Sequence, residues 1–368
     1  MQSQAAVTVG DREIRLQSLP VPDSPPPGGA ILRVTANGLC GSDYDLYTGH
    51  LRKSSPTLAP LPLVSGHEMV GVLELVDEQA AEQWNVRPGD RVAVDPGIRC
   101  GRCAECAGRT GDRCRDERRY STIPLSTGTG LWGGNAQYMV LLPGTFMVEI
   151  PPHLDDEDAT LFNPLSNAIH WTTGAARVRR GDRVLILGAG QRAFTCAAVA
   201  HRAGARQIIV TGLARDRHKA ALLSRFGADE LIDTTAHDTV SRVRELTDGQ
   251  GVDVVIDTVP GATAPTKDGL ATLRQGGRLV AAGIKTAALD GLDLTTLITQ
   301  EHQIRGVFGS SAASTRQAVQ MLADGDYPFS QLHSHRFGLD DLDQALRILG
   351  GEVAGENPLH LTMLPWGA

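Results

Sequence analysis

The chain has 368 residues, of which 41% are hydrophobic and 21% charged, a balance that suits two domains with full-sized cores. Its net charge is -7 and its arginines are mixed with acidic residues, which excludes a basic stripe for nucleic acid or an anionic membrane. It opens with the polar MQSQ and has no long apolar run, so we expect no signal peptide, no transmembrane helix and a cytoplasmic location.

The chain up to about residue 155 reads as short β-strands. They are rich in Val and separated by Pro and Gly turns such as SPPPGG at 24–29. Strands are expected at 30–40, 68–76, 90–96 and 136–144.

Two turns among these strands carry metal-binding side chains. GLCGSDYD at 38–45 contains Cys40, and VSGHEMVG at 64–71 contains His67 and Glu68. One sulfur, one imidazole and one carboxylate bind zinc and leave a position open for substrate, which is the catalytic pattern. A lone Cys or His would more often be a packed core residue, so the prediction depends on all three.

The segment IRCGRCAECAGRTGDRC at 98–114 holds four of the six cysteines in the spacing C-x2-C-x2-C-x7-C. Thiols stay reduced in the cytoplasm, which disfavours a disulfide knot. An iron–sulfur cluster uses similar spacings, but the last Cys lacks the Pro that follows it in the ferredoxin run. We therefore predict a closed structural zinc site whose ligands are Cys100, Cys103, Cys106 and Cys114. Nearby arginines would offset part of its negative charge, namely Arg99, Arg102, Arg109, Arg113 and Arg115.

From about residue 156 to 300 strands and helices alternate, which predicts an α/β domain with a parallel, doubly wound sheet. Strands are expected at 182–190, 206–212, 230–233, 253–259 and 276–284, and helices at 191–205 and 215–228. Beyond about 300 the chain is expected to return to the first domain and to end in a strand at 357–364.

A glycine-rich loop follows the first strand of this second domain. Gly188, Gly190 and Ala193 form G-x-G-x-x-A at the start of the next helix. Such glycines allow close approach of a pyrophosphate to free N–H groups at the helix N-terminus, which predicts dinucleotide binding. A tight turn without a ligand is the alternative.

The end of the next strand indicates which dinucleotide binds. An NAD site usually has an Asp or Glu where this chain has Gly212, and Arg215 follows closely. A missing carboxylate and a nearby cation suit a 2′-phosphate, so we predict NADP(H) in preference to NAD(H). Alternatively, the cations only decorate the start of a solvated helix.

These motifs together resemble the zinc-containing alcohol dehydrogenases of the medium-chain dehydrogenase/reductase superfamily, most closely the polyol and threonine dehydrogenase branch. The resemblance runs nearly end to end, through GLCGSD, GHEMVGVL, the four-cysteine lobe, GDRVLILGAG and FGADELID. It implies a GroES-like β-rich catalytic domain (1–155 and 301–368), interrupted by a Rossmann domain (156–300), with the active site in the cleft between them. It also implies two zinc ions per chain, one catalytic and one structural.

The resemblance further implies hydride transfer between a nicotinamide cofactor and a small alcohol or carbonyl substrate. Ser42 is the candidate for passing the substrate proton toward solvent, although it could also cap a helix. Asp45 stands where many relatives carry a His in the proton relay, so the relay would use a carboxylate or bypass it. Asn163 stands where the branch commonly has a carboxylate near the zinc; it would mark an open metal site or bond to nearby backbone.

Two other functions remain open on this fold: a zinc-independent reductase of activated double bonds, and a non-catalytic dinucleotide-binding protein. Retention of Cys40, His67 and Glu68 together speaks against both. We expect a homodimer or homotetramer with no nucleic-acid or membrane partner.

Overall fold

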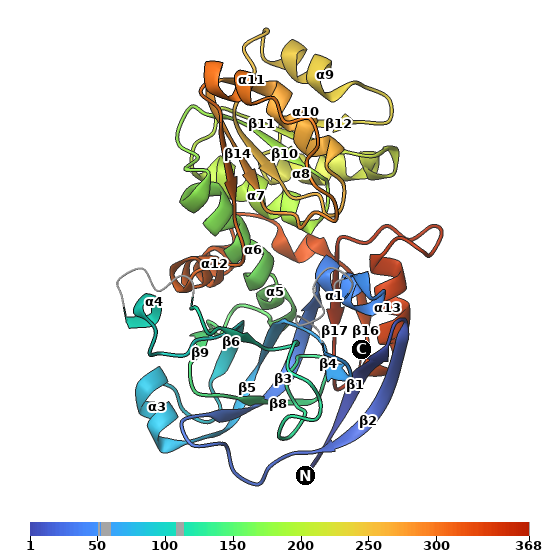
Figure 1. Cartoon of the computed structure of the whole chain (residues 1–368). Helices are drawn as coiled ribbons and strands as arrows, with labels where there is room; N and C mark the ends of the chain where they lie inside the picture. The colour runs from blue at the N-terminus through green and yellow to red at the C-terminus, as the bar shows by residue number, and fades with distance from the viewer. Residues whose placement is uncertain (51, 53–59, 108–113, 368) are drawn as a thin grey trace. The chain divides into compact units, whose positions relative to one another are not determined.

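The computed structural model describes residues 1–50, 52, 60–107 and 114–367 (Figure 1). The chain forms two compact units, one made of Met1–Asn163 with Thr315–Ala368 and the other of Pro164–Ser314. The chain passes from one unit to the other within α6 (Phe162–Ile169) and returns within α12 (Ala312–Asp324). The domain boundaries predicted near 155 and 300 remain a proposal.

The first unit is built on β-sheets. The larger sheet has the order β16-β17-β3-β5-β6-β7, with β8 added to β3 and β9 to β6, and the smaller has the order β2-β1-β4. The strands of the larger sheet are β3 (Ala30–Leu39), β5 (Glu68–Val76), β6 (Arg91–Ile98), β7 (Arg118–Arg119), β8 (Tyr138–Leu141), β9 (Thr145–Glu149), β16 (His333–Phe337) and β17 (His360–Met363). Those of the smaller are β1 (Gln2–Gly10), β2 (Glu13–Pro20) and β4 (Leu63–Val64).

Two apolar clusters hold this unit together. The larger joins β3 and β5 through side chains such as Leu32, Val34 and Met69, all fully buried. The smaller packs α13 (Leu342–Leu349) against Leu39 at the end of β3. The strand from which the predicted site projects is therefore fixed from two sides. The other helices of the unit are α1 (Gly41–Tyr47), α3 (Glu78–Trp84), α4 (Ala104–Ala107) and α5 (Asp156–Thr160), with short 3-10 turns at Phe329–Leu332 and Leu339–Asp341.

The second unit confirms the predicted parallel sheet. Its strand order is β12-β11-β10-β13-β14-β15, and every neighbouring pair is parallel. The strands are β10 (Arg183–Leu187), β11 (Gln207–Gly212), β12 (Glu230–Asp233), β13 (Val252–Asp257), β14 (Leu273–Ala281) and β15 (Gln303–Gly306). The order reverses at β10, which is the topological switch point where such sheets bind ligands.

Helices cover the faces of this sheet (Figure 1). Because crossovers between parallel strands are right-handed, this strand order puts α7 (Gln191–Arg202) and α8 (Ala220–Arg225) on one face, and α9 (Thr239–Leu246) and α10 (Ala264–Thr272) on the other. Other helical segments of this unit are a π-helix at His170–Ala175, a 3-10 helix at Ala214–Lys219 and α11 (Leu294–Thr299). In the described ranges no helix is both long and apolar enough to span a bilayer.

One predicted helix differs from the structure. The helix expected over 215–228 begins as a 3-10 helix (Ala214–Lys219) and becomes α-helical only at Ala220. The Asp216 carboxylate accepts the Leu213 N–H (2.9 Å) and pairs with Lys219 (2.7 Å), which holds this first turn tightly wound.

Candidate active site

The predicted catalytic ligands lie together in the first unit. The ligand atoms of Cys40, His67 and Glu68 all lie within 4.8 Å of one another. Cys40 directly follows β3 and Glu68 begins β5, and the two strands pair with Gly38 opposite Glu68. The site therefore follows from the pairing of two adjacent strand ends.

The charges around His67 favour a cation. Its Nδ1 lies 3.3 Å from Asp43 Oδ1, and the other Asp43 oxygen accepts the Cys40 N–H at 2.9 Å. Burial alone would lower the pKa of His67, but Asp43 and the Cys40 sulfur raise it well above its usual value. A group of donors that stabilises positive charge in this way fits a bound dication.

The Glu68 carboxylate lies over a glycine. A Cβ at Gly38 would stand 2.4 Å from Glu68 Oε2 and 2.7 Å from His360 Cε1. The His360 ring is fully buried and its Nε2 lies 2.9 Å from the Thr160 hydroxyl. Burial, together with the neighbouring His333, holds the pKa of His360 well below its usual range, so the ring beside Glu68 is neutral. Only glycine at 38 leaves room for both side chains.

Ser42 and Asp45 occupy the short helix α1. Ser42 Oγ lies 3.3 Å from His67 Nε2, beside the predicted ligands. Asp45 Oδ1 lies 3.9 Å from His50 Nδ1, and burial raises the pKa of this carboxyl although His50 opposes the shift. Within the described part of the chain no hydrogen bond joins Ser42 to Asp45. The structure thus brings Ser42, but not Asp45, to the ligand group.

Asn163 approaches the same turn from α6. Its Nδ2 donates to the His67 carbonyl oxygen at 3.3 Å. The amide nitrogen therefore supports the backbone of the turn, in line with the second of the two roles expected for this residue.

The four lobe cysteines also gather. Their sulfur atoms lie within 4.8 Å of one another, and Cys100 Sγ and Cys106 Sγ are 3.9 Å apart. Zinc–sulfur bonds of about 2.3 Å in a tetrahedron require sulfur separations of about 3.8 Å, so the group has the right size for zinc. All six cysteines are free thiols, which argues against the disulfide alternative.

The cysteines of the lobe differ in the direction of their pKa shifts. Backbone N–H groups of Arg102 and Cys103 lower the pKa of Cys100 to about 6, whereas burial and the neighbouring thiols raise the pKa of Cys106 to about 12. Arg102 and Arg115 pair with carboxylates, at 3.8 Å from Asp116 and 2.7 Å from Glu105 respectively. Arg109 and Arg113 lie outside the described residues. Because Arg102 and Arg115 already pair with carboxylates, a bound metal ion would offset the negative charge of the lobe thiolates better than these arginines do.

The glycine-rich loop lies at the switch point of the second unit. Gly188 has φ +96°, a conformation that favours glycine, and its N–H donates to Thr211 Oγ1 at 3.2 Å. Gly190 precedes α7, and a Cβ there would meet no described atom within 4 Å. Ala193 is fully buried in the first turn of α7. The loop therefore leaves open space at a helix N-terminus, as a pyrophosphate requires.

The end of β11 has a feature that the sequence reasoning missed. A Cβ at Gly212 would lie 3.0 Å from Asp216 Cβ, so a buried carboxylate from the next turn fills this space. Lys219 pairs with Asp216 and also donates to the Ala189 carbonyl of the glycine-rich loop at 3.1 Å. The D-x-x-K spacing of Asp216 and Lys219 is the sequence signal that could have revealed this ion pair. Arg215 is exposed.

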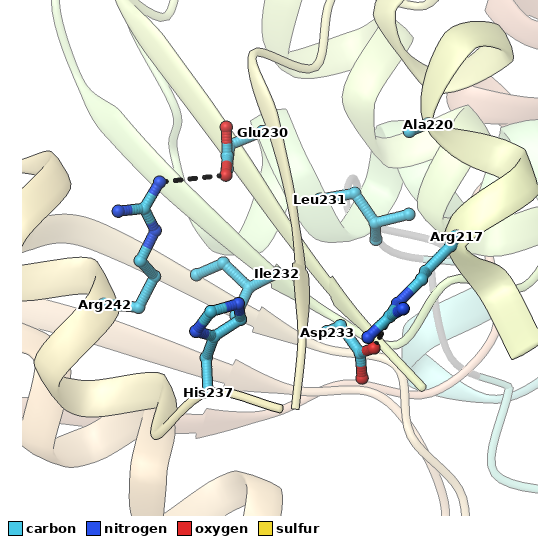
Figure 2. A pocket seen from close by; sticks show the side chains of 8 residues that line it. All are labelled: Arg217, Ala220, Glu230, Leu231, Ile232, Asp233, His237 and Arg242. Carbon is cyan, nitrogen blue, oxygen red and sulfur yellow. Dashed lines mark hydrogen bonds and ion pairs between the residues drawn. The ribbon is translucent and has the colours of Figure 1, made fainter. Parts of the chain in front are cut away.

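A pocket of about 420 Å³ lies nearby, along β12. Figure 2 shows its cations facing carboxylates: Arg217 pairs with Asp233 (2.5 Å) and Arg242 with Glu230 (3.2 Å). Because these arginines are already paired, Arg215 is the better candidate for recognising a phosphate.

The comparisons with known proteins agree with this architecture. Residues 26–152 match the alcohol dehydrogenase GroES-like domain family, and residues 194–324 match the zinc-binding dehydrogenase family. A probable alcohol dehydrogenase of Mycobacterium tuberculosis is 36% identical over 91% of each chain, and sorbitol dehydrogenase of Bacillus subtilis is 31% identical over 93% of this chain and 92% of its own. Among solved structures, that of a zinc-binding dehydrogenase from Sinorhizobium meliloti bound to NADP has a TM-score of 0.84 and 26% identity, covering 99% of this chain and 100% of its own.

The fold and the matched families define an oxidoreductase with a GroES-like catalytic part and a Rossmann part. The chain belongs to the zinc-type medium-chain alcohol dehydrogenase family. Its reaction is NAD(P)-dependent hydride transfer between alcohol and carbonyl compounds.

We expect Gly38→Ala to disrupt the ligand group, because the new methyl would collide with Glu68 and His360. Overpacking of this kind costs about 1–3 kcal/mol of unfolding free energy, measured by urea denaturation, and activity should fall sharply. Gly338→Ala is the matched control, since a Cβ there meets no described atom within 4 Å. If both variants are equally stable and equally active, Glu68 and His360 do not pack against Gly38 as closely as the structure shows.

Proposed function

We propose that the chain is a zinc-dependent alcohol dehydrogenase or carbonyl reductase that holds a catalytic zinc through Cys40, His67 and Glu68. The observation that supports this most directly is the convergence of these three donors within 4.8 Å, beside a buried carboxylate that stabilises positive charge. When bound, the metal would act as a Lewis acid on the substrate oxygen.

The chain's own residues supply the proton path. The Ser42 hydroxyl, 3.3 Å from His67 Nε2, faces the ligand group and would accept the proton of a bound alcohol while it passes its own proton on. Asp45 and His50 would receive it nearer the surface, since both side chains are partly exposed. A water or a cofactor hydroxyl would have to join Ser42 to Asp45.

We propose that the lobe holds a second, structural zinc on Cys100, Cys103, Cys106 and Cys114. Four thiolates leave no ligand position for substrate, so this site would stabilise the fold. Free thiols throughout the chain also suit the cytoplasmic location that we propose.

We propose NADP(H) as the preferred cofactor. No carboxylate projects from Gly212, and the charge of the nearby Asp216 is balanced by Lys219. Arg215 is exposed and available to pair with a 2′-phosphate. The NADP-bound structure from Sinorhizobium meliloti shows that the fold accepts this cofactor.

We propose that two copies associate through β15. In the described part of the chain this edge strand pairs only with β14, and all four of its residues are exposed. The segment 284–308, which contains β15, also carries several exposed large apolar side chains, namely Ile284, Leu292, Leu294, Ile298, Ile304 and Phe308. An edge strand can pair with its own copy about a two-fold axis, which would cover this apolar surface.

Metal analysis tests the zinc sites. We expect about two zinc ions per chain, falling to about one in a folded but inactive Cys40→Ser, His67→Ala double variant. Cys103→Ser is the companion variant and should lower thermal stability more than it alters hydride transfer in the surviving protein. If the wild type holds one zinc and the double substitution leaves activity unchanged, the zinc-independent reductase is favoured. If no alcohol, carbonyl compound or cofactor gives turnover, a non-catalytic protein is favoured.

Cofactor affinity tests the role of Arg215. A charge-assisted pair contributes roughly 1.5 to 3 kcal/mol, so Arg215→Ala should weaken NADP(H) binding about ten- to a hundredfold and NAD(H) binding far less. Arg217→Ala is the matched control because that guanidinium already pairs with Asp233. Equal losses for both cofactors, or a wild-type preference for NAD(H), would refute this assignment.

Sedimentation tests the β15 interface. Introducing charge with an Ile298→Lys, Ile304→Lys double variant should lower the assembled mass, whereas Leu16→Lys on exposed β2 should leave it unchanged. A monomeric wild type, or a double variant with wild-type mass, would exclude this interface.

A further inference from the structure

A chain of buried polar side chains lies behind the metal-binding turn. The Asn37 Nδ2 donates to Asn135 Oδ1 and the Asn135 Nδ2 donates to Ser65 Oγ, both at 2.9 Å. Asn37 and Asn135 are completely buried and Ser65 is 1% exposed. These hydrogen bonds join β3, through Asn37, to the start of the metal-binding turn at Ser65 by way of Asn135, which lies about a hundred residues further along the sequence.

This polar chain ends on a predicted metal ligand. The Asn37 Oδ1 accepts the backbone N–H of Glu68 at 3.1 Å. The other end, Ser65, belongs to the same turn, two residues before His67. The network therefore connects the start of the metal-binding turn to its end through two side-chain amides.

Close packing leaves these amides little freedom. A Cβ at Gly134 would lie 2.5 Å from Asn37 Oδ1, and one at Gly66 would lie 2.6 Å from Asn37 Nδ2. Gly66 also has φ +95°, so the turn needs glycine on conformational grounds. Both polar atoms of the Asn37 side-chain amide are thus held by backbone that approaches to within contact distance.

The surroundings make a purely structural role a poor explanation. The neighbouring Val64, Met69 and Ala136 belong to the large apolar cluster of the unit. Apolar residues of suitable shape stabilise a core at least as well as a buried polar network, whereas a satisfied network fixes geometry. The network lies at the one turn of this cluster that carries two of the proposed ligands.

We propose that Asn37, supported by Asn135 and Ser65, is a positioning residue that fixes the Glu68 backbone so that its carboxylate converges with Cys40 and His67 on zinc. This inference rests on the proposed catalytic zinc. Groups that orient metal ligands typically affect metal affinity about 10- to 100-fold, which sets the size of the expected effect.

The test measures zinc release from purified full-length protein into excess chelator. Asn37→Ala should release the catalytic zinc at least about tenfold faster than wild type. Ser65→Ala keeps the Asn37–Glu68 hydrogen bond and should therefore increase the rate of zinc release less. If Asn37→Ala does not fold, the release rate of Ser65→Ala decides the test. The Cys40→Ser, His67→Ala variant gives the release trace of the lobe zinc alone.

Ser3→Ala is the matched control. Ser3 is completely buried in the same unit, and its hydroxyl oxygen accepts a backbone N–H, that of Tyr138 at 3.0 Å. Its loss should lower thermal stability without changing zinc release. A double Asn37→Ala, Ser65→Ala variant should release zinc no faster than Asn37→Ala, because the two act in one chain.

The outcomes separate the two proposals. A wild type that holds only the lobe zinc overturns the catalytic zinc and this inference with it. A wild type that holds both ions, while Asn37→Ala and Ser65→Ala release zinc at the rate of Ser3→Ala, overturns this inference alone.

Discussion

The pairing register of β3 with β5 determines whether the proposed catalytic ligands can converge. Gly38 lies opposite Glu68, which brings Cys40, just beyond the end of β3, beside the turn that carries His67. A slip of one residue would turn Glu68 to the opposite face of the sheet, because side chains alternate along a strand. Buried Leu32, Val34 and Met69 hold the register from the core side, so ordinary apolar packing supports the metal chemistry.

The two proposed zinc sites use the same electrostatic principle in different surroundings. In the buried site one sulfur and two nearby carboxylates face one imidazole, and in the lobe four sulfurs crowd together. With its thiols ionised, each arrangement would concentrate more negative charge than the neighbouring protein cations offset, and a bound dication would stabilise it. Three donors would leave a coordination position for a substrate oxygen in the buried site, and four thiolates would leave none in the lobe.

The sequence predicted most of the fold because strand and helix patterns, the glycine-rich loop and the cysteine spacing are local signals. It also predicted which donors converge at Cys40, His67 and Glu68. It could not predict the link between Asn37 and Asn135, since nothing local pairs two amides so far apart along the chain. The 3-10 turn at Ala214–Lys219 was missed for a different reason. Helix propensity does not separate a 3-10 turn from an α-helical one, and the contacts of Asp216 with Leu213 and of Lys219 with Ala189 are seen only in the folded chain.

The carboxylate of Asp216 beside Gly212 limits the order in which cofactor recognition can evolve. Introducing an acid at 212 would crowd its Cβ to 3.0 Å from that of Asp216 and place two negative groups in one small space. The intermediate with both acids would be unfavourable, so Asp216 would have to be replaced before or together with Gly212. If NADP(H) is the cofactor, as we propose, a neighbouring side chain would hold a lineage with this arrangement to it, because a single exchange at the strand end is unfavourable.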